Sequence, residues 1–461
     1  MSGRRVLVVA YYFPPLGGVG VQRTLKFIEH LPRAGWQPVV VAPRGATYRV
    51  MDPSAVERLP PELEVHRALS LEPAGVRGAV RGVVRHAIGP FRGRHAQDPV
   101  VAGPAASGGR DNRQPGGPRR WLNLAWRAGV RTLFVPDEQM AWIPAAARVG
   151  ARVHRRQPVE VLYSSSPPAS THLAAGLIKA LTGRPWVADF RDPWVGNAFA
   201  SPPSPLHRAA ERWLERWVIA RADRVVFATP GLRARYVSRY PTRSDRFVTI
   251  TNGYDRAELG EPEPHHRGTH EPFRLVYAGS VYGEAELRIF LDGLALAAER
   301  RPNLSDRLRV DFVGWMTPPN QALALQRAAK LEPILSIAGQ VPRSEAIVRV
   351  RSADASLLLL ADGPDRDLFI GAKLFEAIGL DRQLLAMAPP GDTRDILAEL
   401  NWGVVADPEP SSVADALLRL LDSPLPEGPA DPAGRYDRSG LAARLATVLA
   451  EVAASHVEGS R

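Results

Sequence analysis

The chain repeats one pattern twice: a short apolar run, a glycine-rich or polar turn, and a segment with the apolar spacing of a helix. In the first instance, residues 6–10 are an apolar run of β type, Gly17-Gly18-Val19-Gly20 forms the turn, and residues 21–34 have helical spacing. Residues 39–42 are apolar again and predict the next strand. This succession is typical of a doubly wound α/β fold with a parallel sheet, in which ligands bind at the carboxyl ends of the strands.

The pattern restarts after a segment rich in proline, histidine and charge at residues 258–272, which predicts a linker between two domains. The remaining expected strands lie at residues 159–163, 186–190, 225–227 and 248–250 before the linker, and at 275–280, 310–314, 336–338, 355–360, 384–386 and 403–405 after it. The expected organisation is a domain at 1–257, the linker at 258–272, a second domain at 273–425, and a tail with a helix at 426–461 that packs back on the first domain.

The charge of the chain is concentrated in one segment. The 461 residues carry a formal net charge of +11, yet residues 77–131 contain eleven arginines against only Asp98 and Asp111, a local charge of +9. Residues 77–120 are also rich in glycine and proline, which predicts a mobile insertion. No compact nucleic-acid motif accompanies these arginines, so we expect no nucleic-acid partner and interpret the insertion as a surface for anionic lipid.

Several classes of protein are excluded by what the sequence lacks. With no cysteine, disulfides, thiolate zinc sites and a cysteine nucleophile are all impossible. The apolar run at residues 6–10 is shorter than the core of a signal peptide, and we find no uninterrupted apolar run long enough to span a membrane. We therefore expect a cytoplasmic protein, peripheral at the inner face of the plasma membrane.

The glycine turn at residues 17–20 does not fit a dinucleotide-binding fingerprint. The position that needs glycine or alanine holds Arg23, and the second strand ends in Ala42-Pro43 without an acid for a ribose hydroxyl. Glycines that allow close backbone approach, followed by a helix amino terminus, still suit a phosphate. A tight turn without a ligand is the alternative.

A second candidate site lies where Gly371 precedes an expected helix. Lys373 falls in the first turn, where its charge has the wrong sign for the helix dipole, and a bound anion would compensate it. Glu376 lies one turn further along and is placed to accept hydrogen bonds from sugar hydroxyls. The alternative for this pair is a solvated surface Lys and Glu.

Polar residues also end the expected strand that begins at Trp186. Asp189, Arg191 and Asp192 should cluster at the sheet edge, and strand alternation places Asp189 and Arg191 on one face. Structural ion pairing is the alternative. On the following helix, Trp213 and Trp217 are four residues apart, which an amphipathic helix packed on a sheet explains.

Seven short motifs occur in order along nearly the whole chain outside residues 70–120. They are Tyr12-Phe13-Pro14-Pro15-x-Gly17-Gly18, Phe134-x-Pro136-Asp137-x-x-x-x-Trp142, Ser165-Ser166-Pro167-Pro168, Asp189-Phe190-Arg191-Asp192-Pro193-Trp194, Asn252-Gly253-x-Asp255, Tyr277-Ala278-Gly279-Ser280-x-Tyr282 and Lys373-Leu374-Phe375-Glu376. Together they resemble the family 4 retaining glycosyltransferases, most closely bacterial members from polysaccharide or glycolipid pathways. The resemblance implies the GT-B fold, two Rossmann-like domains facing across a cleft.

The resemblance also implies roles for individual residues. Gly17 and Gly18 match the loop that contacts the donor diphosphate, Lys373 suits the donor phosphates, and Glu376 matches the second Glu of a pair that binds the nucleotide ribose. Val341 lies in the segment whose backbone meets the nucleobase. The implied donor-binding set is Gly17, Gly18, Ser280, Arg288, Val341, Lys373, Leu374 and Glu376.

The sequence departs from the family pattern at three places. Leu368 occupies the position of the first Glu of the pair. The basic pair of many members falls near Ser280 and Glu286, with Arg288 as a substitute, and the histidine of many members is Arg191 here. The implied activity is transfer of a sugar from a nucleotide-sugar to an acceptor hydroxyl, lipid-linked in some pathways, with retention of configuration and without a metal or other cofactor.

Under the hypothesis of a retaining glycosyltransferase, Asp192 or Asp189 orients the acceptor hydroxyl, and Arg191 holds these carboxylates or contacts phosphate. Two alternatives stay open. One is a nucleotide-sugar epimerase of the same fold, and the other is an inactive nucleotide-sugar-binding protein at a membrane assembly complex.

Overall fold

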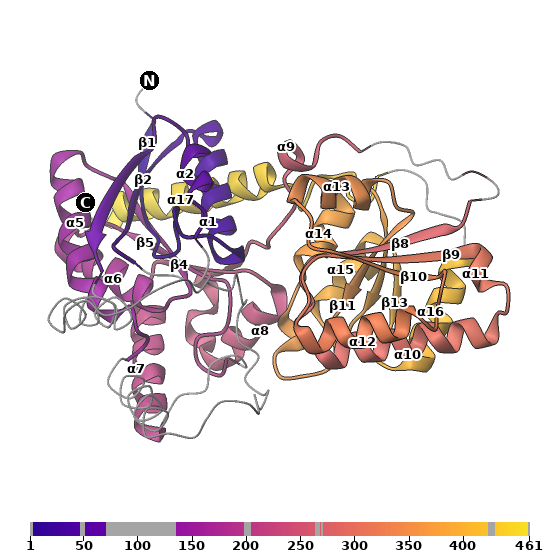
Figure 1. The fold of residues 1–461 in the computed structure, drawn as a ribbon. Coiled ribbons are helices and arrows are strands. Elements are labelled where there is room, and N and C mark those ends of the chain that lie inside the picture. Colours follow the sequence, from indigo (N-terminus) through magenta and orange to yellow (C-terminus); the bar gives the residue numbers. More distant parts are fainter. Residues whose placement is uncertain are drawn as a thin grey trace, which may run out of the picture. The chain divides into compact units, whose positions relative to one another are not determined.

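The fold is described from a computed structural model of the chain (Figure 1). The structure describes residues 3–46, 51–70, 135–197, 204–262, 268, 271–422 and 429–459. The predicted insertion at 77–120 lies outside the described residues. The chain divides into two compact units, each with its own sheet, and each is described by itself.

The first unit comprises residues 1–228, 232–250 and 442–461. Its seven-stranded sheet is entirely parallel, in the order β3-β2-β1-β4-β5-β6-β7. The strands are β1 (Arg4–Val9), β2 (Trp36–Arg44), β3 (Glu64–Leu69), β4 (Val161–Ser166), β5 (Trp186–Phe190), β6 (Arg224–Phe227) and β7 (Phe247–Thr249). In the central strand β1, Val6 through Val9 are fully buried, because helices cover both faces of a parallel sheet.

The strands of the first unit are joined by helices that cover the sheet. The described helices are α1 (Val19–His30), α2 (Ser54–Glu57), α5 (Ile143–Arg156), α6 (Ser170–Thr182), α7 (Pro205–Arg221), α8 (Pro230–Arg239) and most of α17 (Arg438–Gly459). Asp137 fixes the start of α6, since its carboxylate accepts from the backbone N–H of Ser170 at 2.9 Å. Burial raises the pKa of Asp137.

The second unit comprises residues 229–231 and 251–441. Its six parallel strands follow the order β10-β9-β8-β11-β12-β13, with the order reversing beside β8. The strands are β8 (Phe273–Ala278), β9 (Leu308–Val313), β10 (Leu335–Gly339), β11 (Ala355–Leu359), β12 (Gln383–Met387) and β13 (Val404–Ala406). An order that reverses beside the first strand is typical of doubly wound sheets, which bind ligands at this point.

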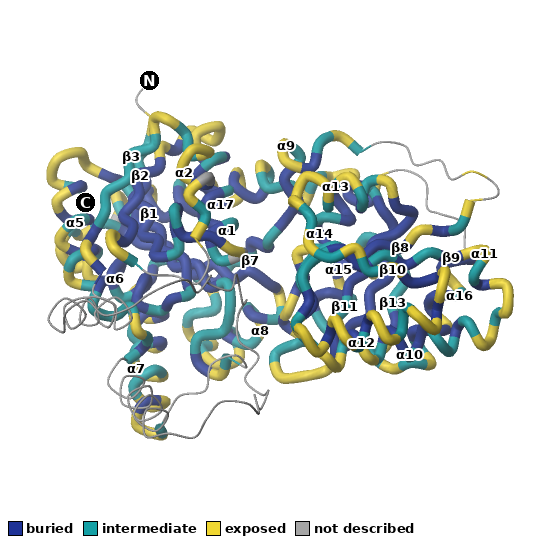
Figure 2. Tube along the Cα trace, in the orientation of Figure 1, coloured by how far each residue is buried: buried dark blue, intermediate teal, exposed yellow. Residues whose placement is uncertain are grey.

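Helices again connect the strands of the second unit. They are α9 (Arg256–Leu259), α10 (Glu284–Arg300), α11 (Leu304–Arg307), α12 (Pro318–Ala328), α13 (Arg343–Arg351), α14 (Ala372–Gly379), α15 (Asp392–Leu400) and α16 (Pro410–Asp422). One core contains Leu275, Phe290 and Phe312 between sheet and helices, and a second contains Leu374 and Phe375 of α14. Figure 2 shows the strands of both sheets as buried and many helical turns as exposed.

Helix α17 satisfies the length and apolar composition of a membrane span over Arg438–Glu458, and within the described part of the chain it alone does so. Of the most apolar window of this helix, 44% is buried. The buried residues Leu441, Leu445, Leu449 and Val452 recur every three or four positions and form one stripe. Such a stripe is typical of a helix that packs on a protein core, and a single helix of this composition is weak evidence for a membrane span.

The structure corrects one prediction about α7. Trp217 packs on Gly176 of α6, and Arg221 lies over its ring, 4.5 Å from the ring centroid. Trp213 is instead 62% exposed, so the prediction that both tryptophans pack inward is wrong for Trp213. The contact of α7 with α6 is made by Trp217, one turn after Trp213. The ring of Trp213 lies on the exposed side of α7.

Candidate active site

In the first unit, the glycine turn leads directly into the amino terminus of α1. Gly18 is the N-cap and has φ +88°, a conformation that favours glycine. The first turn of α1 contains no acidic side chain, so the positive end of the helix dipole is not neutralised from within. A glycine N-cap and a first turn without an acid are the local geometry expected of the anion-binding turn that the sequence predicts.

Arg191 lies beside this turn. Its guanidinium donates to the backbone oxygen of Gly20, and its Nη2 is 3.8 Å from the carboxylate of Asp192. Arg191 is largely buried, whereas the side chain of Asp192 is 43% exposed. The structure therefore brings Arg191 to Gly20, at the end of the glycine turn, and it leaves Asp192 accessible at the carboxyl end of β5.

Asp189 is placed differently from Asp192, because it is fully buried within the sheet. Its carboxylate accepts from Arg23 at 2.8 Å through both oxygens, from Tyr163 at 2.7 Å and from Ser165 at 2.9 Å. Asp189 bonds to Arg23 of α1, and Arg191 bonds to Gly20 of the same helix. Both residues therefore face α1, which agrees with the common face predicted for Asp189 and Arg191. The geometry of Asp189 is that of a structural ion pair, the alternative that the sequence left open.

Arg67 also contacts the loop before the glycine turn, and the sequence did not predict this role. Arg67 of β3 donates to the backbone oxygens of Pro14 and, at 3.3 Å, Pro43. Burial lowers the pKa of Arg67. Arg67 thus ties the loop that precedes Gly17 to strands β2 and β3. No sequence motif marks Arg67, since its role depends on contacts with Pro14 and Pro43 of other segments.

In the second unit, three neighbouring strands end in glycines that have positive φ. Gly279 and Gly314 have φ +138°, and Gly339 has φ +72°. The backbone N–H of Gly279 donates to Val313, and that of Gly314 donates to Gly339, each at 2.7 Å. A Cβ on Gly314 would overlap the carbonyl oxygen of Gly279, so the close approach of these two chains requires glycine.

Lys373 reaches over this glycine edge from the first turn of α14. Its Nζ lies 4.4 Å from the ring centroid of Tyr277, and a Cβ built on Gly279 would lie 2.8 Å from it. Gly371 is the N-cap of α14, as predicted, and Leu374 is buried in the core. The structure therefore brings Lys373 together with the turn that contains Ser280, while Leu374 contributes its position in the helix rather than its side chain.

Glu376 is engaged by an arginine from another helix. Both terminal nitrogens of Arg343 donate to Oε1 of Glu376 at 3.1 Å, and Nε of Arg343 donates to Glu258 at 2.5 Å. Although burial acts against the charge, these two carboxylates raise the pKa of Arg343. Arg343 is the first residue of α13 and follows Val341 by two positions. Its bond to Glu376 therefore joins the segment that contains Val341 to helix α14.

Arg288, another predicted donor-site residue, is paired within its own helix. It is exposed on α10 and pairs at 2.5 Å with Glu284 one turn earlier. Glu286 pairs instead with Arg366 at 3.2 Å. Leu368 is buried, as expected of an apolar side chain in the position of a family carboxylate. The fold thus brings Arg366 to Glu286, a pairing that the sequence did not predict.

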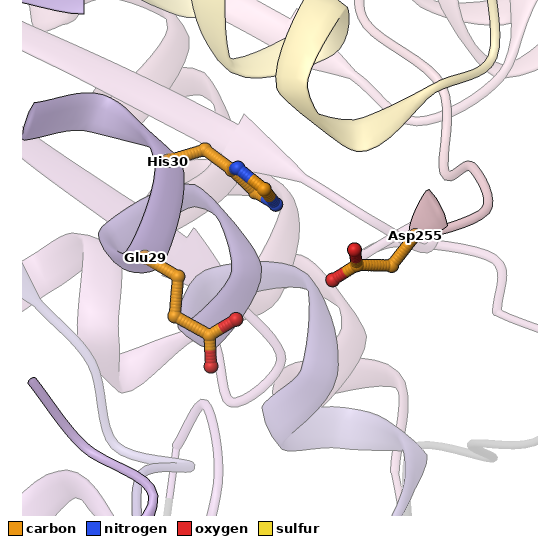
Figure 3. Close-up of side chains that lie close together, drawn as sticks. All are labelled: Glu29, His30 and Asp255. Carbon is orange, nitrogen blue, oxygen red and sulfur yellow. The ribbon is translucent and has the colours of Figure 1, made fainter. Parts of the chain in front are cut away.

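Figure 3 draws three further polar side chains, which belong to different units. Glu29 and His30 close α1 in the first unit, where Glu29 accepts from Lys26 at 2.8 Å. Asp255 caps α9 in the second unit and accepts from the backbone N–H of Ala257 at 3.0 Å. Each acid has a structural role in its own unit, and we assign no cation site to them.

Two parallel doubly wound units with these strand orders define the GT-B fold class, which confirms the predicted fold. Solved structures that cover nearly the whole chain share it. The lipopolysaccharide outer core galactosyltransferase WaaB aligns with a TM-score of 0.57 and 10% identity over 97% of this chain and 99% of that one. The Anabaena protein Alr3699/HepE in complex with UDP-glucose aligns at 0.51 and 12% over 99% of each chain. A putative UDP-N-acetylglucosamine 2-epimerase from Listeria monocytogenes aligns at 0.52 and 12% over 99% and 97%.

One part of the sequence also matches a known family. Residues 80–258 match the family model described as Glycosyltransferase Family 4, which agrees with the resemblance that the motifs predicted. Among curated proteins, none matches the chain.

Proposed function

We propose that the protein transfers a sugar from a nucleotide-sugar to an acceptor hydroxyl with retention of configuration and without a metal. The observation that carries the proposal is the position of Lys373, whose Nζ lies above Gly279 at the carboxyl edge of the second sheet. The Anabaena protein of this fold that binds UDP-glucose supports a nucleotide-sugar donor.

The chemistry requires stabilisation of the leaving group. The bond between the anomeric carbon and the diphosphate oxygen breaks, and the nucleoside diphosphate leaves with the electron pair. The oxygen of the acceptor hydroxyl forms the new bond to the anomeric carbon, and its proton passes to the leaving diphosphate. Lys373 and the backbone N–H groups at the amino terminus of α14 would stabilise the charge that develops on the phosphates, an effect that ranks among the largest in enzymes.

The first unit would supply the acceptor side of the reaction. Asp192 is accessible at the end of β5 and would orient the acceptor hydroxyl, while Arg191 and the turn at Gly17-Gly18 offer positive charge nearby. Because Asp189 is buried and bonded to Arg23, its role in this proposal is to hold α1 against β5.

The proposed pathway is the synthesis of a cell-surface polysaccharide or glycolipid, and the transferred group is a hexosyl or N-acetylhexosaminyl unit. We place the enzyme in the cytoplasm, peripheral at the inner face of the plasma membrane, with a lipid-linked acceptor. A galactosyltransferase of lipopolysaccharide synthesis with the same fold supports the pathway class.

The test is to incubate the purified protein with a panel of UDP-, GDP- and dTDP-sugars. Slow hydrolysis of one donor is the expected result, since water replaces the missing acceptor. Interconversion of the sugar would indicate an epimerase, which the fold also permits because the Listeria monocytogenes epimerase shares it. Thermal stabilisation without turnover would indicate an inactive binding protein. If no nucleotide changes the melting temperature, the proposed donor site is wrong.

A further inference from the structure

A cavity in the first unit lies outside the predicted site. It has a volume of about 730 Å³ and lies between the loop that follows β5, helix α7 and the end of α8. Trp194 belongs to its lining, two residues beyond the proposed acceptor-orienting Asp192. Its indole Nε1 is buried and finds no hydrogen-bond acceptor within the described ranges of the chain.

Five charged residues of α7 line this cavity because their spacing places them on one face of the helix. They are Arg208, Glu211, Arg212, Glu215 and Arg216. The arginines occupy positions i, i+4 and i+8, so neighbouring guanidinium groups are close and repel each other. This arrangement of like charges suggests a ligand of opposite charge.

Glu215 does not neutralise these arginines, since all its hydrogen-bonding capacity is used elsewhere. One oxygen accepts from Arg239 and Tyr240, each at 2.8 Å. The other accepts from the backbone N–H of Val195 at 2.9 Å and from Tyr236 at 2.7 Å. Glu215 is fully buried, and its charge is matched by Arg239.

Glu211 offers only weak compensation. Its side chain is largely buried, and its carboxylate lies 3.6 Å from His207. Burial, followed by repulsion from Asp137 and Glu215, raises the pKa of Glu211 to about 7, and the charge of Arg208 offsets only part of this rise. Near neutral pH a large fraction of Glu211 is therefore protonated, and no salt bridge joins Arg208, Arg212 or Arg216 to a carboxylate in the part of the chain that the structure describes.

We propose that this cavity binds a phosphate group of the acceptor through Arg208, Arg212 and Arg216. Guanidinium groups bind phosphate oxygens through paired, charge-assisted hydrogen bonds, and an indole N–H can add another. The site deepens the proposed function, because it assigns a phosphate-bearing substrate to the unit that contains Asp192. On the same helix, the apolar side chains of Leu206 and Trp213 are 80% and 62% exposed. The phosphate can thus belong either to a lipid-linked acceptor or to a soluble phosphorylated sugar.

The experiment compares two double variants by calorimetric titration with inorganic pyrophosphate. Arg212→Gln/Arg216→Gln removes two charges from the cavity. Arg148→Gln/Arg152→Gln removes two charges at the same spacing on the exposed side of α5, and it serves as the matched control. We expect the cavity variant to lose about tenfold or more in affinity and the control to bind like the wild type. Absence of binding to the wild type, or equal weakening in both variants, would overturn the proposal.

The Lys373→Ala variant separates this site from the proposed donor site, which also suits pyrophosphate. The binding that depends on Arg212 and Arg216 should persist in that variant, and its disappearance there would assign the anion to the donor site and overturn the proposal. Donor hydrolysis measured in the cavity variant should remain. If hydrolysis is absent from the wild type while the cavity still binds pyrophosphate, the proposed function fails and the anion site stands.

Vesicles distinguish the two sources of phosphate. Sedimentation is measured with phosphatidylcholine vesicles that contain phosphatidic acid, against vesicles of phosphatidylcholine alone. Loss of the acid-dependent sedimentation in the cavity variant, but not in the control, supports a phosphate at a membrane surface. Unchanged sedimentation together with weakened pyrophosphate binding supports a soluble phosphorylated acceptor.

Discussion

The guanidinium of Arg23 and the carboxylate of Asp189 form a two-point ion pair inside the first unit, with both nitrogen–oxygen distances at 2.8 Å. Both residues are buried, and Tyr163 and Ser165 complete the hydrogen bonds of the carboxylate. Burial acts to raise the pKa of Asp189, but the charge and hydrogen bonds of Arg23 hold it below its ordinary value. The pair fixes α1, and with it the glycine turn, against β5.

We predict that Arg23→Leu destabilises the first unit by about 3–5 kcal/mol, because it leaves the Asp189 charge buried without a partner. The double variant Arg23→Leu/Asp189→Asn should recover part of this loss, since the buried charge is then gone. Urea unfolding measures both. A loss below about 1 kcal/mol in Arg23→Leu would contradict the structural role that we assign to the pair.

Lys373→Ala should weaken binding of the donor nucleotide by about tenfold to a hundredfold, the range for losing a charged contact to phosphate. Its thermal stability should stay close to that of the wild type, because Lys373 contacts the ring of Tyr277 and is only partly buried. Lys330→Ala removes an exposed lysine of the same unit and is the control. Equal nucleotide affinities of the two variants would remove Lys373 from the donor site.

Gly314→Ala should destabilise the second unit by several kcal/mol, whereas Gly339→Ala should cost about 1 kcal/mol. Both glycines have positive φ, but only the Cβ at Gly314 would overlap the backbone of Gly279, and the Cβ at Gly339 meets nothing within 4 Å. Thermal unfolding of the two variants tests the difference. Similar melting temperatures would show that the two strand ends do not approach as closely as described.

Glu211→Gln should be more stable than the wild type at pH 8, by roughly 1–2 kcal/mol after allowance for solvent screening. The pKa of Glu211 is raised from 4.5 to about 7 in the folded protein, chiefly by burial. A raised carboxyl pKa favours folding at low pH, and this contribution is lost as the pH rises from 4.5 through 7. Denaturant unfolding at pH 5 and 8 should therefore show the advantage of the variant growing with pH, and a constant difference would contradict the raised pKa.

The strands that the sequence predicted contain apolar residues in succession, whether they are central or at an edge of their sheet. Residues 6–10 and 355–360 are continuous apolar runs, and strands occupy Arg4–Val9 and Ala355–Leu359. The edge strand β3 (Glu64–Leu69) was missed because its charged and polar residues leave no apolar run, whereas the edge strands β7, β10 and β13 were predicted. The helix start after Gly371 was also predicted, whereas α1 begins at Val19, two residues before the predicted start at residue 21.

The candidate site was predictable as a set of positions and not as a set of contacts. Lys373 at the first turn of a helix and Asp192 after a buried strand follow from local patterns. The ion pairs depend on which segments the fold brings together. They are Glu376 with Arg343, Arg288 with Glu284, and Glu286 with Arg366.

The sequence by itself determined the two-domain α/β class and the resemblance to the family 4 glycosyltransferases, because apolar periodicity and short motifs are properties of neighbouring residues. Only the tertiary structure decided that Asp189 is a structural partner of Arg23, 166 residues away, and that a face of α7 lines a charged cavity. The physical reason is that the free energy of a charged group depends on its desolvation and on its partner, and both are set when distant segments pack.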